Sequence, residues 1–184
     1  MSFLHSLPPD AGLLQIFQAF PEVARPLLEY HEVLLRGESP FTLGERELIA
    51  AYVSGLNHCH YCHAVHSQTA VALGVDPNTI VNIFSNPQHE CVDPRMRPVL
   101  AFVCKLTLSP GKIAAVDADA VVAAGWNNRA LHDAVAICGL FNLMNRLVNG
   151  LGVEASEPYT RIAAQRLAEK GYASLAGLLP SSPQ

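Results

Sequence analysis

Apolar residues recur at three- and four-residue intervals along most of the chain, which is the pattern of amphipathic helices. Residues 21–35 show it clearly, with apolar side chains at helical spacing before Gly37: Val23, Leu27, Leu28, Val33 and Leu34. Alternation of apolar and polar residues, the pattern of a half-buried strand, is nearly absent. The sequence therefore predicts an all-α fold.

Capping residues divide the rest of the chain into further helices. Thr42 and Glu45 form a capping box, Gly74 is a typical C-terminal glycine, and Asp76 and Asp93 each precede a proline suited to the first helical position. We expect helices over residues 21–35, 42–57, 59–74, 77–85, 94–108, 117–124, 127–149 and 158–170.

A chain of 184 residues fits one domain with a core of its own. We expect a single helical bundle of about seven to nine helices over residues 1–184, with its core at about 20–155. The helix at 158–170 would follow this core, and the tail at 179–184 would be frayed.

Composition excludes several classes of protein. Half of the residues are apolar and 15% are charged, which excludes a disordered chain. So few charges also suggest that surface is buried between subunits, so we expect a homo-oligomer. The net charge is −4 and no run of Lys or Arg occurs, so we expect no nucleic-acid partner.

Location follows from two further observations. No apolar stretch reaches 18 residues, and residues 1–9 lack the basic and apolar regions of a secretory signal, so we expect neither a membrane span nor export. Five cysteines without an export signal indicate the reducing cytoplasm. There, a Cys-x-x-Cys pair is more typical of catalysis or metal binding than of a structural disulfide.

Cys59, Cys62 and His66 are the main candidates for chemistry. On a helix, their side chains fall within an arc of about 60°. A helix start favours the thiolate, and an imidazole four residues after Cys62 can take its proton. We predict that Cys62 attacks an O–O bond, and that Cys59 then closes a disulfide that an outside reductant must open.

Glu47 is the third part of the predicted site. It is not needed as a cap and shares a helix face with small residues, where another helix can approach closely. We expect it to be either desolvated, which raises its pKa, or paired with a donor such as His66. It would then orient the imidazole or pass protons to the thiols.

Other candidate residues are interpreted as structural. His58, His60 and His63 are treated as surface or packing histidines, of which His63 is the best alternative catalyst. The remaining cysteines have apolar neighbours and are expected to behave as small hydrophobes: Cys91, Cys104 and Cys138. A polar stripe is interpreted as a helix or subunit contact rather than a substrate site: Asn142, Asn145, Arg146 and Asn149.

Three alternatives use the same residues. The run from Cys59 to His63 is a Cys-x-x-Cys-His pattern, as in c-type haem attachment, but haem is normally attached after export. A zinc site could combine both thiols, His66 and Glu47, although no second ligand pair is present. A binding or scaffold module without turnover would keep its thiols unchanged in hydroperoxide.

Several motifs resemble those of one family. The spacing from Glu47 through Cys59 and Cys62 to His66, with the stretches at 57–62, 101–107 and 141–147, resembles alkylhydroperoxidase D-like proteins. These belong to the carboxymuconolactone decarboxylase superfamily, and the likeness is greatest to its peroxidase-related branch. It covers most of residues 20–155. One departure is Tyr61, where well-studied members carry a histidine.

This resemblance implies an all-α, obligately oligomeric fold, as trimers or hexamers, with the active site near a subunit contact. It also implies a peroxidatic Cys62, a resolving Cys59 and a proton relay through Glu47 and His66. We therefore predict a cytoplasmic, thiol-dependent peroxidase without metal or haem. Its substrates would be a hydroperoxide and a reductant such as a lipoyl carrier, a thioredoxin-like protein or a small thiol. A general dithiol–disulfide oxidoreductase and a zinc-binding module are the alternatives.

Overall fold

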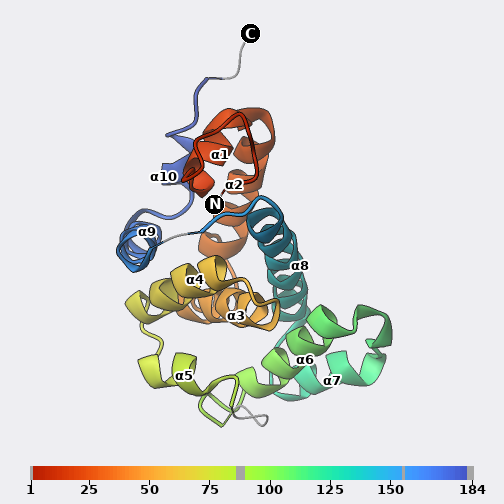
Figure 1. The fold of residues 1–184 in the computed structure, drawn as a ribbon. Helices are drawn as coiled ribbons and strands as arrows, with labels where there is room; N and C mark the ends of the chain where they lie inside the picture. Colours follow the sequence, from red (N-terminus) through yellow and green to blue (C-terminus); the bar gives the residue numbers. More distant parts are fainter. Residues whose placement is uncertain (1, 86–89, 155, 182–184) are drawn as a thin grey trace.

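The protein is described by a computed structural model that covers residues 2–85, 90–154 and 156–181 (Figure 1). Ten α-helices and one 3-10 turn make up its regular structure, and these ranges contain no strand. The elements are α1 (Leu13–Ala19), α2 (Pro21–Arg36), α3 (Leu43–Leu56), α4 (His60–Ala72), α5 (Pro77–Asn82), α6 (Met96–Leu108), η1 (Pro110–Lys112), α7 (Ala115–Ala123), α8 (Asn128–Gly150), α9 (Glu157–Lys170) and α10 (Ala173–Ala176).

The predicted all-α class is confirmed, and the described residues hold more helices than expected. The two additions are α1 and α10, of seven and four residues. Helices this short are not stable by themselves and do not produce a full period of apolar positions. Their formation therefore depends on packing, and α10 lies against α2.

Most predicted caps are present. The Thr42 hydroxyl accepts from the Glu45 N–H at 3.2 Å, while the Glu45 carboxylate accepts from the Thr42 N–H at 2.8 Å. Asp76 accepts from the Asn78 N–H. Asp93 differs from the prediction, because its carboxylate accepts from the Arg95 N–H at 2.8 Å in a turn, and α6 begins only at Met96.

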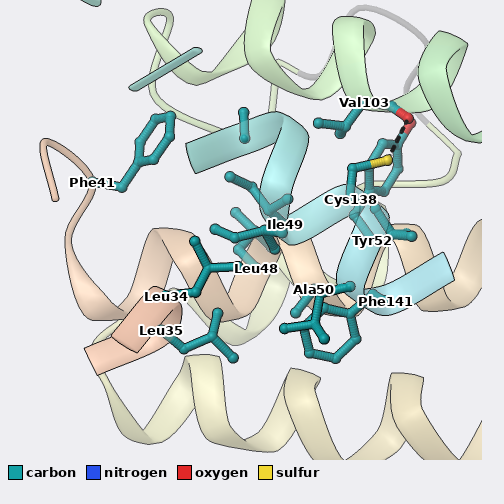
Figure 2. Close-up of a cluster of buried hydrophobic side chains, with 14 of the residues drawn as sticks. Leu34, Leu35, Phe41, Leu48, Ile49, Ala50, Tyr52, Val103, Cys138 and Phe141 are labelled. Atoms are coloured by element: carbon teal, nitrogen blue, oxygen red, sulfur yellow. Dashed lines mark hydrogen bonds between the residues drawn. The ribbon is translucent and has the colours of Figure 1, made fainter. Parts of the chain in front are cut away.

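The interior is built around α3, which is buried on nearly all sides. Figure 2 shows Leu48, Ile49 and Ala50 of α3 among side chains from other segments, including Phe41 and Phe141. Cys138 lies in the same cluster, where its thiol points to the Val103 carbonyl at 3.8 Å. Burial raises the pKa of the Cys138 thiol, which agrees with its predicted behaviour as a small hydrophobe.

The site is positioned by the antiparallel pair α3 and α4, the most extensive helix pair in the described part of the chain (Figure 1). Close approach is possible because the facing residues of α3 are small: Ala50, Ala51 and Ser54. At the far end, a side chain on Gly44 would lie 2.9 Å from the Leu73 carbonyl oxygen. Glu47 is thereby placed opposite the middle of α4, and Ser54 opposite its start.

The end of the chain differs in part from the prediction. Leu179 is buried, and the Pro180 carbonyl accepts from the Arg25 guanidinium at 3.1 Å, so the predicted fraying does not begin at 179. Residues 182–184 lie outside the described ranges. Across the helices that the structure describes, none combines the length and apolarity needed to cross a bilayer.

Candidate active site

Cys59 and Cys62 lie together at the start of α4. Cys59 is its N-cap residue, and Cys62 lies three residues later in the first turn. Both are free thiols and are almost completely buried, with 0% and 2% of their surface exposed. They form a small apolar cluster with Ile16, Val148 and Val153. The structure therefore brings the two predicted sulfurs together, but it shields them from solvent.

The two thiols have different proton affinities. The pKa of Cys59 is lowered to about 7, mainly because the Cys62 thiol donates to its sulfur; burial opposes this, and the Cys62 N–H and the Asn145 amide add to it. The Cys59 side chain forms no capping hydrogen bond to the helix, so the backbone N–H groups make only a secondary contribution to its lowered pKa. Donation to Cys59 and burial raise the Cys62 pKa well above its usual range. The negative charge therefore favours Cys59, the thiol that the sequence-based prediction made the resolving one.

Hydrogen bonds to Ser54 and Asn57 fix the orientation of the Asn145 amide beside the two sulfurs. Ser54 donates its hydroxyl to the Ala50 carbonyl at 2.8 Å, so its oxygen accepts from Asn145 Nδ2 at 3.0 Å. Asn57 Nδ2 donates to Asn145 Oδ1 at 2.9 Å. These contacts leave the Asn145 NH₂ group facing the dithiol, where it lowers the pKa of both thiols. The sequence analysis placed Asn145 in a structural stripe and missed this role.

Glu47 and His66 form the second half of the site. His66 Nδ1 lies 2.7 Å from Glu47 Oε2, as one of the two predicted arrangements required. Glu47 is fully buried, and burial alone would raise its pKa. The hydrogen bond and charge of His66, with the charge of Arg36, hold the pKa below its ordinary value. Glu47 therefore remains a carboxylate, which accepts from Nδ1–H and orients the imidazole.

Two further residues complete the ionic cluster and were missed by sequence reasoning. Arg36 Nη2 lies 2.7 Å from Glu47 Oε1, and its guanidinium lies 5.0 Å from the centre of the Tyr172 ring. The Tyr172 hydroxyl donates to Glu47 Oε1 at 3.0 Å. Arg36 ends α2 and Tyr172 precedes α10, so neither neighbours Glu47 in sequence. The only signal for Arg36 was a basic residue at a helix end, which a surface residue would also give.

The contact predicted between His66 and Cys62 is not made in this conformation. His66 follows Cys62 by one turn of α4, but among the described residues no hydrogen bond joins the imidazole to either sulfur. The other histidines lie elsewhere. His58 and His60 are exposed, and His63 Nδ1 lies 3.0 Å from the Ala51 carbonyl oxygen. None of the three contributes to the dithiol.

The zinc alternative requires four side chains to converge on one point. In the ranges that the structure describes, no three His, Cys, Asp or Glu side chains do so. Both Glu47 oxygens are instead bonded to Arg36, His66 and Tyr172. This donor arrangement suits proton positioning rather than tetrahedral coordination.

A cavity of about 170 Å³ adjoins the ionic cluster. His31, His66 and Tyr172 line it, together with apolar side chains from α1, α4, α8 and α9. The thiols are not part of its wall. Leu13 and Tyr61 contact both the cavity and the thiol cluster, so they separate the two spaces.

An all-α fold with a buried Cys-x-x-Cys dithiol beside a Glu–His pair defines a class of helical thiol proteins. The sequence profile of the carboxymuconolactone decarboxylase family matches residues 21–104, which include all four predicted site residues. No curated protein matches the sequence.

Solved structures agree with this match. A peroxidase-related protein from Silicibacter sp. TM1040 is 28% identical over 80% of this chain and 78% of its own, with a TM-score of 0.74. One from Ralstonia eutropha JMP134, described as an alkylhydroperoxidase AhpD core, is 26% identical over 79% and 78%, with a TM-score of 0.73. The debrominase Bmp8, at 19% identity over 82% and 81% and a TM-score of 0.68, shares the fold. Residues 21–104 therefore resemble the carboxymuconolactone decarboxylase family, and the chain is similar in sequence and fold to alkylhydroperoxidase D-like, peroxidase-related proteins.

Proposed function

We propose that the protein is a thiol-dependent peroxidase that reduces organic hydroperoxides through a Cys59–Cys62 dithiol/disulfide cycle. The observation that carries the proposal is the buried thiol pair, in which one sulfur is favoured as the thiolate near neutral pH. The imidazole held by Glu47 one turn further along α4 supports it. The peroxidase-related names of two similar structures point the same way.

The difference in proton affinity suggests how Cys62 becomes the nucleophile. At rest the charge lies on Cys59, and the Cys62 thiol donates to it. Transfer of that proton to Cys59 produces a Cys62 thiolate, so Cys59 acts as the base for its neighbour. Cys62 then attacks the terminal oxygen of R–O–O–H, the O–O bond breaks, and the imidazole of His66 relays a proton to the leaving alkoxide.

The second half of the cycle closes the disulfide. The Cys59 thiol attacks the Cys62 sulfenic acid, the S–O bond breaks, and water leaves. The products are one alcohol, one water and one disulfide, and two electrons have passed from the thiols to the peroxide. A dithiol reductant, such as a lipoyl carrier or thioredoxin-like protein, then returns the disulfide to thiols.

A second candidate is a general dithiol–disulfide exchanger of the same fold. It is supported by the free thiol pair itself, which can pass two electrons to a disulfide as well as to a peroxide. The fold is also compatible with other chemistry, since Bmp8 is a debrominase whose cysteine-to-alanine variant has been crystallised with 2,3,4-tribromopyrrole. For this chain we further propose a cytoplasmic homo-oligomer, a trimer or hexamer, to be tested by light scattering.

The test weighs intact Cys59→Ser and Cys62→Ser proteins after a small excess of cumene hydroperoxide. The Cys59→Ser protein should gain one oxygen and the Cys62→Ser protein none, whereas the unchanged protein should lose both thiols without gaining oxygen. Cys138→Ser is the matched control, because this buried thiol lies outside the pair and its loss should change nothing.

Each role has its own contrary result. Oxygen gained by the Cys62→Ser protein would make Cys59 the attacker. If the unchanged protein kept both thiols in peroxide but exchanged them with a protein disulfide, the second candidate would replace the first.

A further inference from the structure

The cavity beside His66 is large enough for one small molecule. Its volume of about 170 Å³ is close to that of an engineered apolar cavity of about 150 Å³ that stays dry and binds benzene. Its wall is mostly aliphatic and aromatic. Tyr159 and Ile162 of α9 belong to this wall and are substantially exposed, so the cavity reaches the surface along α9. It therefore suits a body about the size of one ring.

His31 contributes a hydrogen-bond acceptor, its Nε2 atom, to the residues that line this cavity. Its Nδ1 lies 2.7 Å from the Leu27 carbonyl oxygen. A carbonyl can only accept, so Nδ1 carries the hydrogen. Burial lowers the pKa of His31 to about 4, which keeps the ring neutral and leaves a lone pair on Nε2. The residue is only 3% exposed, and of its two ring nitrogens only Nδ1 is hydrogen-bonded to a described residue.

This unused acceptor selects among ligands. An apolar ligand alone would displace solvent from Nε2 without replacing its hydrogen bond, which costs free energy. A ligand with a hydroxyl donor would satisfy it. His31 and His66 both pack against Phe141 and Tyr172, so a ligand bound to His31 lies beside the catalytic imidazole.

We propose that this cavity binds a molecule with one ring-sized apolar group and a hydroxyl that donates to Nε2 of His31. The inference deepens the proposed function, on which it rests for its link to catalysis. An aryl or aralkyl hydroperoxide has both features, because its terminal O–H is the donor. Leu13 or Tyr61 must move aside for its O–O bond to reach Cys62, since both lie between cavity and thiols.

Phenol and toluene are matched probes of the site, because they have nearly the same shape and only phenol donates. Binding to the reduced protein is measured by titration calorimetry, with no peroxide present. The unchanged protein should bind phenol at least about tenfold more tightly than toluene, because toluene leaves the Nε2 acceptor of His31 without a donor, and an unsatisfied buried acceptor weakens binding by about that factor or more. This comparison needs no variant.

Two variants locate the binding. His31→Leu removes the acceptor and should reverse the preference toward toluene. Ala163→Phe fills the cavity from α9 and leaves His31 in place, and should weaken both ligands by at least about tenfold. Circular dichroism confirms that each variant is folded. Toluene bound as tightly as phenol by the unchanged protein, no binding of either, or unchanged binding in Ala163→Phe would each overturn the inference.

Thiol loss in cumene hydroperoxide, measured on the same protein, separates this inference from the proposed function. Phenol binding without thiol loss would refute the peroxidase and leave the cavity assignment standing. Thiol loss without phenol binding would refute the cavity assignment alone.

Discussion

Replacement of Asn145 by leucine should raise the pKa of Cys59. Leucine has nearly the same shape as asparagine but cannot donate to sulfur, so the apolar packing around the dithiol is kept. The residue is buried, and its NH₂ group is directed toward the thiols by the contacts of its amide with Ser54 and Asn57. The substitution removes one donor from the thiolate, together with the hydrogen bonds of this amide to Ser54 and Asn57.

The magnitude follows from the partners of Cys59. A hydrogen bond to a charged group contributes about 1.5–3 kcal/mol, and one pKa unit corresponds to about 1.4 kcal/mol. Asn145 is the smallest of the contributions that lower this pKa, so we take the lower end of the range. The pKa of Cys59 should rise by about one unit, from about 7 toward about 8.

The assay follows thiolate absorbance in the ultraviolet as pH is raised, in a background in which Cys91, Cys104 and Cys138 are alanine. Asn142→Leu is the matched control. Asn142 belongs to the same hydrogen-bond network, and its oxygen accepts from Asn57 Nδ2 at 3.1 Å. The Cys59 pKa is not influenced by Asn142, so it should stay near 7 in this variant.

Two results would refute the reasoning. An unchanged midpoint in Asn145→Leu would show that the amide does not stabilise the thiolate. An equal rise in Asn142→Leu and Asn145→Leu would show that the network acts through general packing at the α3–α8 contact rather than through one donor.

Three further predictions concern stability and access. Glu47→Gln should destabilise the fold by about 3–5 kcal/mol at pH 7, because Arg36 is left with a buried unpaired charge. This difference in stability should become smaller below pH 4.5, because the Glu47 carboxyl of the unfolded state is then protonated. Urea titrations at the two pH values measure it. Burial lowers the pKa of His31 from 6.5 to about 4, so the unfolded state binds a proton at higher pH than the folded state does. The stability of the fold should therefore decrease by about 3 kcal/mol as the pH falls from 6.5 to 4. His31→Leu should not show this decrease, and an equal pH dependence in both proteins would contradict the prediction. Leu13→Ala should speed alkylation of the two thiols at least severalfold, because Leu13 packs against their cluster, whereas Leu14→Ala, at a neighbouring cavity position, should not.

Sequence reasoning predicted the parts of the site that lie on one helix pair. The position of Glu47 on its helix left two possibilities, desolvation or pairing with a donor such as His66, and the structure shows the pairing. The Cys-x-x-Cys spacing predicted that two sulfurs lie close together. Local periodicity and capping are sufficient for such features, since both depend on residues within a few turns of one another.

The residues that were missed reach the site from distant parts of the chain. Arg36, Asn145 and Tyr172 are placed by helix packing, which no local pattern encodes. Asn145 did give a signal, as a polar residue on a largely apolar helix, but the partner that gives it meaning was not predictable. The charge preference for Cys59 was missed for the same reason, because it depends on donors around both sulfurs.

The Glu47 carboxylate and the dithiol, the two groups of the site that can carry negative charge, lie at opposite ends of the α3–α4 contact. Glu47 and Ser54 are seven residues apart on α3, or about 10 Å along its axis. The carboxylate that orients His66 is neutralised locally by Arg36, so it does not repel a thiolate at the other end. The dithiol is served instead by neutral donors, which lower a pKa less than a cation would. Nucleophilicity falls as thiol pKa falls, and the best attacking thiol has a pKa near ambient pH. The Cys62 thiol, with a smaller contribution from the Asn145 amide, therefore favours a Cys59 thiolate near neutral pH without a cation beside it.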